Sequence, residues 1–268
     1  MGASLEFEKY EGLGNDFIVV EAPDERAISP ERASHLCDRR FGVGADGVLL
    51  VLPPASASGE VRMRVINADG SIPEMCGNGV RCVALHVARA RRLRQGTVRV
   101  ETDAGERECV VEDTGADAMV TVDMGPVRLL GERAVDVQGG RVVLAMADTG
   151  NPHAVLFGTF ARADVEHLGP RLATDPGFPR GTNVEFACVL GDGIDLVVWE
   201  RGVGITLACG TGACATVAVA CDKGLAARGM PVTVRLPGGR LEVTLDDAGR
   251  ATMRGPARHV YSGRVKVD

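Results

Sequence analysis

Two short motifs place a cysteine directly before a Gly-x-Gly sequence. Cys76 opens Cys-Gly-Asn-Gly and Cys209 opens Cys-Gly-Thr-Gly, and a long run rich in Ala and Val follows each motif. Such a run is typical of a buried helix, so each cysteine is predicted to stand at a helix start. Free backbone N–H groups and the helix dipole favour anions there, which can lower the pKa of a thiol or bind a carboxylate.

A pair of such thiols has a specific chemical use. One thiolate can remove a proton from one face of a stereocentre while a thiol returns a proton to the other face, without metal or cofactor. A single cysteine in this context is equally well explained as a small buried side chain in a tight turn. Because the whole context occurs twice, we favour acid and base chemistry by Cys76 and Cys209.

The chain contains a second echo at nearly the same offset. Gly14-Asn15-Asp16-Phe17 corresponds to Gly150-Asn151-Pro152-His153, with the asparagines 136 residues apart, whereas the two cysteines are 133 residues apart. Two echoes at similar offsets predict duplication of a unit of about 130 residues. We expect an N-terminal half-domain over residues 1–124 and a C-terminal one over residues 125–255, with the active site in the cleft between them. Residues 256–268 are a candidate for return to the first half.

Apolar and β-branched runs predict more strands than helices, by two or three to one. Helices are expected at Ser29–Asp38, Gly77–Leu93, Phe160–Gly169 and Gly210–Lys223, with Gly96 and Gly224 as stop signals. This ratio disfavours a strict βαβ repeat. It favours a mixed α/β (α+β) fold of two pseudo-symmetric domains, each a mostly antiparallel mixed sheet wrapped around a central helix.

Composition narrows the functional class. The chain has 268 residues, 45% hydrophobic and 25% charged, with a formal net charge of −6. These values are typical of a globular protein and disfavour nucleic acid or an anionic membrane as the main partner. Neither a secretory signal nor an apolar run long enough for a membrane span is visible, so a cytoplasmic location with reduced cysteines is expected.

Two kinds of bound group are not expected. No Cys-x-x-Cys pair occurs among the eight cysteines, so no metal site is predicted. A Schiff base with pyridoxal phosphate would require Lys9, Lys223 or Lys266, and none of them lies in the cysteine motifs. The sequence therefore predicts that the protein uses no cofactor.

Six motifs, in order, resemble the diaminopimelate epimerase family: GLGNDF, NADGSIPEMCGNGVRC, GNPHAV, GTNVEF, WERGVG and ACGTGAC. The resemblance spans the chain from Gly12 to the GPARHVYSG tail. It implies a cofactor-independent isomerase that interconverts LL- and meso-diaminopimelate in lysine and peptidoglycan precursor synthesis. Its implied fold is the diaminopimelate epimerase-like fold.

The resemblance also implies residue roles. Cys76 and Cys209 would be the catalytic acid and base, and His153 and Glu200 would tune their ionisation. The implied substrate-binding residues are polar side chains and glycines near the motifs, namely Asn15, Asn67, Gly77, Asn78, Asn151, Asn183, Glu200, Arg201, Gly210 and Thr211. Tyr261 corresponds to a dimer contact, so a homodimer is implied. Asp69 is expected to be a turn residue.

Two positions depart from the family pattern, and three alternatives stay open. Gly47 stands where some members have Gln, and Ile205 stands where Glu is frequent.

The first alternative function is a racemase for another amino acid, against which Asn78 and Arg201 argue. The second is a thiol redox protein in which Cys76 and Cys209 form a reversible disulfide. The third is a non-catalytic binding module, which does not explain the paired cysteines.

Overall fold

The computed structural model describes residues 3–115, 118–137 and 140–267. The chain divides into two compact units: unit 1 comprises Met1–Val122 and Gly255–Asp268, and unit 2 comprises Asp123–Arg254. The chain passes from one unit to the other within β7 (Ala118–Pro126) and again within β16 (Arg250–Val267).

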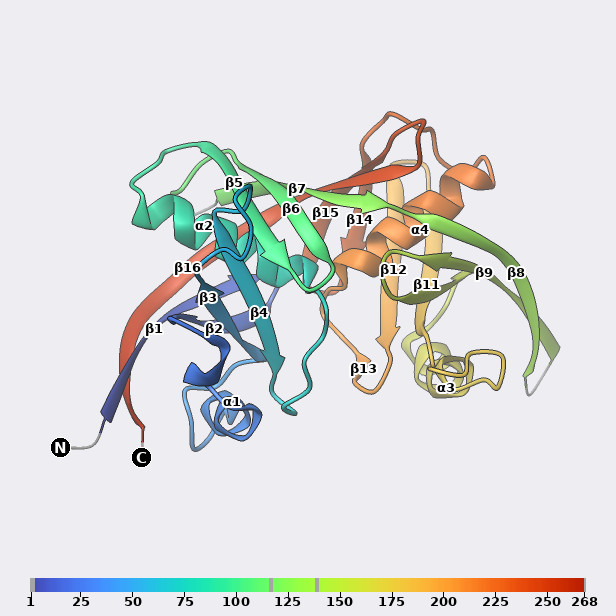
Figure 1. Cartoon of the computed structure of the whole chain (residues 1–268). Helices are drawn as coiled ribbons and strands as arrows, with labels where there is room; N and C mark the ends of the chain where they lie inside the picture. The colour runs from blue at the N-terminus through green and yellow to red at the C-terminus, as the bar shows by residue number, and fades with distance from the viewer. Residues whose placement is uncertain (1–2, 116–117, 138–139, 268) are drawn as a thin grey trace. The chain divides into compact units, whose positions relative to one another are not determined.

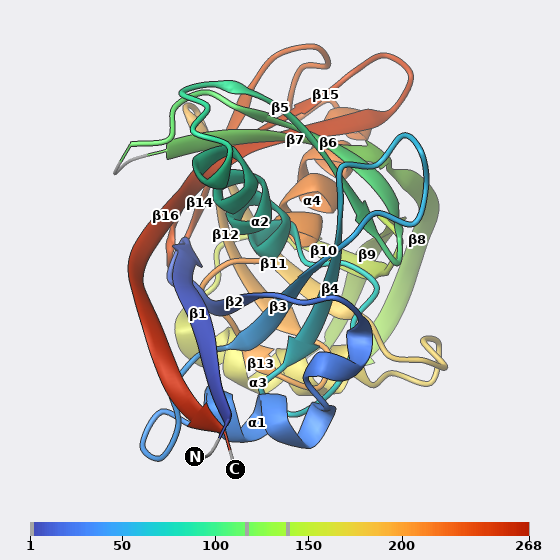
Figure 2. The same ribbon diagram turned by 60° about the vertical axis from the view of Figure 1, so that its left-hand side comes forward.

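Unit 1 is a layer of strands with one helix packed against each of its two faces. Its helices are α1 (Pro30–Cys37) and α2 (Gly77–Ala90), with a short 3-10 turn η1 (Glu25–Ala27). Its strands are β1 (Ala3–Gly12), β2 (Asn15–Glu21), β3 (Gly47–Leu52), β4 (Val61–Asn67), β5 (Gly96–Thr102) and β6 (Gly105–Val111), followed by the first part of β7. β1 also pairs with the last part of β16, so the start of β1 and the end of β16 lie side by side (Figure 2).

Burial on both faces of the sheet explains the hydrophobicity of unit 1. All six residues of β3 are buried. Val48, Leu50 and Leu52 belong to the core cluster that contains Leu36 of α1, whereas Leu49 lies against the first turn of α2. A strand covered on both sides has no polar face, which is why its sequence does not alternate.

Unit 2 repeats this plan with different side chains (Figure 1). Its helices are α3 (Arg162–Ala173) and α4 (Gly210–Asp222). Its strands are β8 (Arg128–Val137), β9 (Gly140–Asp148), β10 (Pro152–Phe157), β11 (Asn183–Leu190), β12 (Gly193–Glu200), β13 (Gly204–Ile205), β14 (Val232–Leu236) and β15 (Gly239–Leu245), with the first part of β16. α4 is buried from Gly210 to Ala220, as expected for a helix that is apolar all round.

The strand pairings of the two units match one by one. In unit 1 the successive pairs from β1 to β6 are antiparallel, parallel, antiparallel, parallel and antiparallel. The series β9, β10, β11, β12, β14 and β15 has the same order of directions. The predicted class is therefore confirmed: two pseudo-domains, strand-rich, mostly antiparallel, each with a central helix.

The register of the matching parallel pairs identifies equivalent residues. Phe17 lies opposite Gly47 between β2 and β3, and His153 lies opposite Asn183 between β10 and β11. Both residues of the second pair follow their counterparts by 136 positions, the offset of the asparagine echo. By the same offset, Leu49 in β3 is equivalent to Glu185 in β11.

Two helices differ from the prediction at their ends. α2 ends at Ala90 and not at Leu93, because Arg92 adopts a positive φ of 57° and its N–H bonds back to Arg89 O. Gly96 therefore starts β5 and is not the stop residue. α3 begins at Arg162, after a cap in which the Asp164 carboxylate accepts the Ala161 N–H, and it continues past Pro170 to Ala173. Gly224, with φ 69°, does follow the end of α4 as predicted.

The central position of α2 leads to a stability prediction. Leu85 on α2 is fully buried, whereas Leu130 on β8 is 53% exposed. Leu85→Ala is expected to lower the free energy of unfolding by about 2–5 kcal/mol because the strands around α2 cannot close over the lost volume. Urea titration followed by circular dichroism measures the effect, with Leu130→Ala as the matched control. Equal midpoints for the two variants would contradict this account of the core.

Candidate active site

Each central helix begins with a thiol as its N-cap. Cys76 and Cys209 have extended backbone torsion angles, and each sulfur accepts a hydrogen bond from the third residue of its helix. The Gly79 N to Cys76 Sγ and Gly212 N to Cys209 Sγ distances are both 3.4 Å. The first helical turn therefore places N–H groups beside both sulfurs, where negative charge is stabilised.

In unit 1, amides link Cys76 to the β1–β2 turn. Asn15 Oδ1 lies 4.0 Å from Cys76 Sγ and accepts a hydrogen bond from Asn78 Nδ2 at 3.2 Å. The Asn78 Oδ1 atom accepts from Arg81 at 2.9 Å. Arg81 is fully buried, and it also donates to the carbonyl oxygens of Gly77 and Pro256. A buried positive charge thus lies in the first turn of α2.

Asn15 contacts a network of charged side chains that the sequence analysis did not single out. Asp46, directly before β3, accepts from Asn15 Nδ2 at 2.8 Å, and Arg39 bridges Asp46 and Asp16 at 2.7 and 2.6 Å. Buried Lys9 pairs with Asp16 at 2.5 Å. Burial alone would raise the pKa of Asp16, but Arg39 and Lys9 hold it below its usual range. The signal available in the sequence was a charged run, RRFGVGAD, next to a fully apolar strand.

In unit 2, acidic side chains surround Cys209. Its sulfur is 3.4 Å from Thr211 Oγ1, and the thiol is hydrogen-bonded to Glu200. Glu200 accepts from Thr206 Oγ1 at 2.6 Å, and burial raises the pKa of the Glu200 carboxyl. Burial, reinforced by the charges of Glu200 and Glu185, raises the pKa of the Cys209 thiol well above its usual range. This environment favours the neutral thiol form of Cys209.

His153 and Glu185 form a buried pair beside this thiol. The His153 Nδ1 to Glu185 Oε1 distance is 2.6 Å, and both side chains are fully buried. His153 Nε2 is 2.9 Å from Asn151 Oδ1. Glu185 is a residue that the sequence analysis missed, although a Glu between Val184 and Phe186 in an apolar strand was a visible signal.

The remaining sequence-predicted residues lie at strand ends and in turns. Asn67 ends β4 and donates to Ser71 Oγ at 2.9 Å, and Asp69 accepts the Ser71 N–H at 2.8 Å as a turn residue. Asn183 Oδ1 accepts the Arg201 N–H at 2.9 Å, and the exposed Arg201 guanidinium donates to Arg180 O at 2.6 Å.

The two departures from the family pattern have local explanations. A Cβ atom at Gly47 would lie 2.9 Å from Ile66 O, so a larger side chain would require a backbone shift. Ile205 pairs with Trp199 between β12 and β13, and both pack against the α3 core cluster. An apolar residue at 205 therefore contributes to packing, which a carboxylate would not do.

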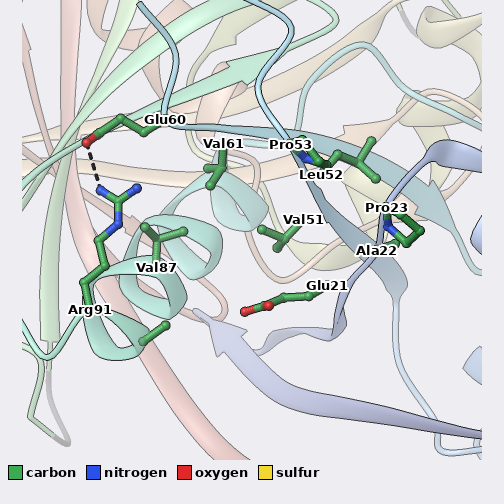
Figure 3. A pocket seen from close by; sticks show the side chains of 11 residues that line it. Glu21, Ala22, Pro23, Val51, Leu52, Pro53, Glu60, Val61, Val87 and Arg91 are labelled. Carbon is green, nitrogen blue, oxygen red and sulfur yellow. Dashed lines mark hydrogen bonds and ion pairs between the residues drawn. The ribbon is translucent and has the colours of Figure 1, made fainter.

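A surface pocket of unit 1 lies apart from the cysteines. It lies in unit 1 between β2, β3 and the end of α2, where Val87, Ala90 and Arg91 line it (Figure 3). Cys76 caps the opposite end of this 14-residue helix, about 20 Å away. The pocket is therefore separate from the cysteine chemistry.

Residues 3–115, 118–137 and 140–267 contain no group of three or more His, Cys, Asp or Glu side chains that could hold a metal ion. No helix in those ranges is long and apolar enough to cross a membrane.

Comparisons with known proteins agree with the motifs. The sequence model of the diaminopimelate epimerase family matches residues 7–130 and 145–260. Diaminopimelate epimerases of Synechocystis sp. and Thermosynechococcus vestitus are 42% and 43% identical, over 98% of this chain and 100% and 99% of theirs. The Desulfitobacterium hafniense enzyme is 43% identical over 98% of this chain and 99% of its own length.

Solved structures show the same fold at lower identity. A hydroxyproline epimerase from Agrobacterium vitis has a TM-score of 0.80 and 18% identity, and covers 100% of this chain and 94% of its own. A PhzF-family phenazine biosynthesis protein from Bacillus anthracis has a TM-score of 0.73 and 16% identity over 99% of this chain and 100% of its own. These structures establish the fold, whereas the closer sequence relatives and the family match establish the family. The chain belongs to the diaminopimelate epimerase family and is an isomerase.

Proposed function

We propose that the chain interconverts LL- and meso-diaminopimelate without a cofactor, in lysine and peptidoglycan precursor synthesis. The observation that carries the proposal is the pair of thiol-capped helices at equivalent positions of two matching units. In this proposal Cys76 and Cys209 act on opposite faces of one α-carbon. One removes the α-proton and the other donates a proton, so configuration inverts.

The charges around the two thiols support a proposal for their resting states. Buried Arg81 lies in the first turn of α2, whereas the equivalent residue in α4 is the uncharged Cys214. Glu200 and Glu185 lie beside Cys209, and their unit 1 equivalents, Asn67 and Leu49, are uncharged. Cys76 is accordingly the resting thiolate and Cys209 the resting thiol, so Cys76 is the first base.

The helix N-termini also supply the stabilisation that proton removal needs. Loss of the α-proton places negative charge on the substrate carboxylate. The N–H groups of Gly77, Asn78, Gly210 and Thr211, at the two helix starts, bind that carboxylate. The glycines allow the backbone to approach it closely.

Amides and one arginine recognise the rest of the substrate. Diaminopimelate has two ammonium and two carboxylate groups, and the side chains of Asn15, Asn67, Asn151 and Asn183 supply both donors and acceptors for them. Arg201 binds the distal carboxylate in place of its present carbonyl partner, and Glu200 binds an ammonium group.

We also propose a homodimer in the cytoplasm. Tyr261 is 43% exposed on β16, with its ring edge-on to Phe7 at 5.9 Å, and neighbouring Val260 is 50% exposed. These apolar side chains supply a contact for a second copy. A reducing cytoplasm preserves the thiols that the mechanism needs.

Solvent isotope incorporation tests the reaction. Reduced protein, without added pyridoxal phosphate, is incubated with LL-diaminopimelate in deuterated water. We expect meso product carrying one solvent-derived α-deuteron. Exchange of proline or other amino acids instead would contradict the substrate. No exchange on any amino acid would contradict the epimerase mechanism and favour a redox role for the cysteines.

Single cysteine variants test the two-base mechanism. Cys76→Ala and Cys209→Ala are each expected to lower kcat by at least about 10³-fold, because each face needs its own proton carrier. Cys188→Ala, at a half-buried cysteine outside both motifs, is the matched control and should keep wild-type turnover. Near-normal kcat in either motif variant would contradict the mechanism.

The acidity of Cys209 gives a further prediction. Because the Glu200 charge contributes to the raised pKa of Cys209, Glu200→Gln should lower that pKa. Alkylation of Cys209 by iodoacetamide at fixed pH should then accelerate by about tenfold per pKa unit. Mass spectrometry of the Cys209 peptide measures the rate, with Glu242→Gln, at an exposed position of β15, as the control. An unchanged rate would show that Glu200 does not hold the thiol protonated.

A further inference from the structure

Glu185 and His153 form a polar pair where the other unit is apolar. Their equivalents in unit 1 are Leu49 and Phe17, which are both buried. Leu49 and Glu185 contact the first turn of their central helices in the same way: a Cβ at Gly79 would lie 3.0 Å from Leu49 Cδ2, and one at Gly212 would lie 2.9 Å from Glu185 Oε1. Apolar side chains thus suffice for packing at this position.

Burying an ionisable pair costs desolvation free energy that an apolar pair avoids. Glu185 and His153 are fully buried, and burial raises the pKa of the Glu185 carboxyl despite the opposing effect of His153. Since unit 1 shows that the fold does not require this polarity, the pair calls for an explanation other than packing.

The orientation of the Asn151 amide and the protons of His153 are linked. With Oδ1 facing the ring, His153 Nε2, 2.9 Å away, is the donor and carries a proton. At the other ring nitrogen, Nδ1 and Glu185 Oε1 share a proton across 2.6 Å. The second Glu185 oxygen accepts the Ala154 N–H at 3.1 Å, which fixes the carboxylate in place.

A second hydrogen bond uses the same orientation of the Asn151 amide. Its Oδ1 accepts a second hydrogen bond from Thr149 Oγ1 at 3.0 Å, so both lone pairs are used. Among the described residues, no protein group accepts a hydrogen bond from Asn151 Nδ2, and the residue is half-buried. The amide therefore turns its NH₂ group away from His153.

We propose that Glu185 is a positioning residue: through His153 it fixes the Asn151 amide so that Nδ2 donates a hydrogen bond to a substrate carboxylate. The inference rests on the proposed function, in which Asn151 binds diaminopimelate. If Nε2 lost its proton, the amide would rotate to donate to it and would present Oδ1 to the substrate. A carboxylate would then meet an acceptor in place of a donor.

Two substitutions of Glu185 separate this role from simple packing. Glu185→Gln keeps the orientation, because its Oε1 must accept the Ala154 N–H and its NH₂ then donates to His153 Nδ1, which leaves the proton on Nε2. Its KM should stay within about threefold of wild type. Glu185→Met leaves His153 Nδ1 without its partner, so neither the Nε2 proton nor the amide orientation is held in place. Its KM should rise by about tenfold, the loss of one hydrogen bond to a charged group. The change in kcat should be smaller than the change in KM.

A double-mutant cycle tests whether Glu185 affects KM through Asn151. Asn151→Ala removes the amide that Glu185 positions, so Glu185→Met should not raise KM further in that background. Glu101→Met is the matched control: Glu101 in unit 1 is also buried and accepts backbone N–H groups from Ala55 and Ser56. It should lower Tm without raising KM. Additive effects in the cycle, or an unchanged KM in Glu185→Met, would overturn the proposal.

Nitrogen-15 NMR of His153 in substrate-free wild type gives a readout that does not depend on any variant folding. A proton on Nε2 is expected in wild type and in Glu185→Gln. An unprotonated Nε2 in wild type would overturn the proposal. A wild-type enzyme that leaves LL-diaminopimelate unchanged would instead overturn the proposed function. The NMR spectrum needs no substrate, so it tests the positioning of Asn151 by Glu185 and His153 separately from the reaction.

Discussion

The hydrogen bond from a helix N–H group to a cysteine sulfur is the interaction on which the candidate site depends. It requires a central helix buried by strands, so that its first turn has a fixed position, and glycines that leave the N–H groups accessible. Both conditions are met in α2 and in α4, where Cys76 and Cys209 are the N-caps. The surrounding strand layers hold these two helix starts in place.

Duplication supplied the same backbone twice, and substitution then gave the two copies different charges. Unit 1 has buried Arg81 in the first turn of its helix, whereas unit 2 has Glu185 and Glu200 near the sulfur. Proton transfer from one face to the other needs one base and one acid, so equal thiols would serve it poorly. The difference between the units is therefore as important to the chemistry as their similarity.

The polar pair of unit 2 illustrates the energetic cost of this difference. Leu49 shows that an apolar side chain packs well below the first helical turn. Glu185 at the equivalent position is tolerated because His153 and the Ala154 N–H satisfy its oxygens. Stability is exchanged for a fixed orientation of the Asn151 amide, as is common where a site must be preorganised.

Motifs and periodicity in the sequence were sufficient to predict the duplication, the fold class, the central helices and the positions of both cysteines. These features depend on local patterns that each segment carries by itself. Strands β1 and β16 were not predicted, since charged residues interrupt them and their pairing joins residues about 250 positions apart. Only the tertiary structure brought Glu185 to His153 and Asp46 to Asn15, because each contact depends on strand register and on burial, which no local pattern contains.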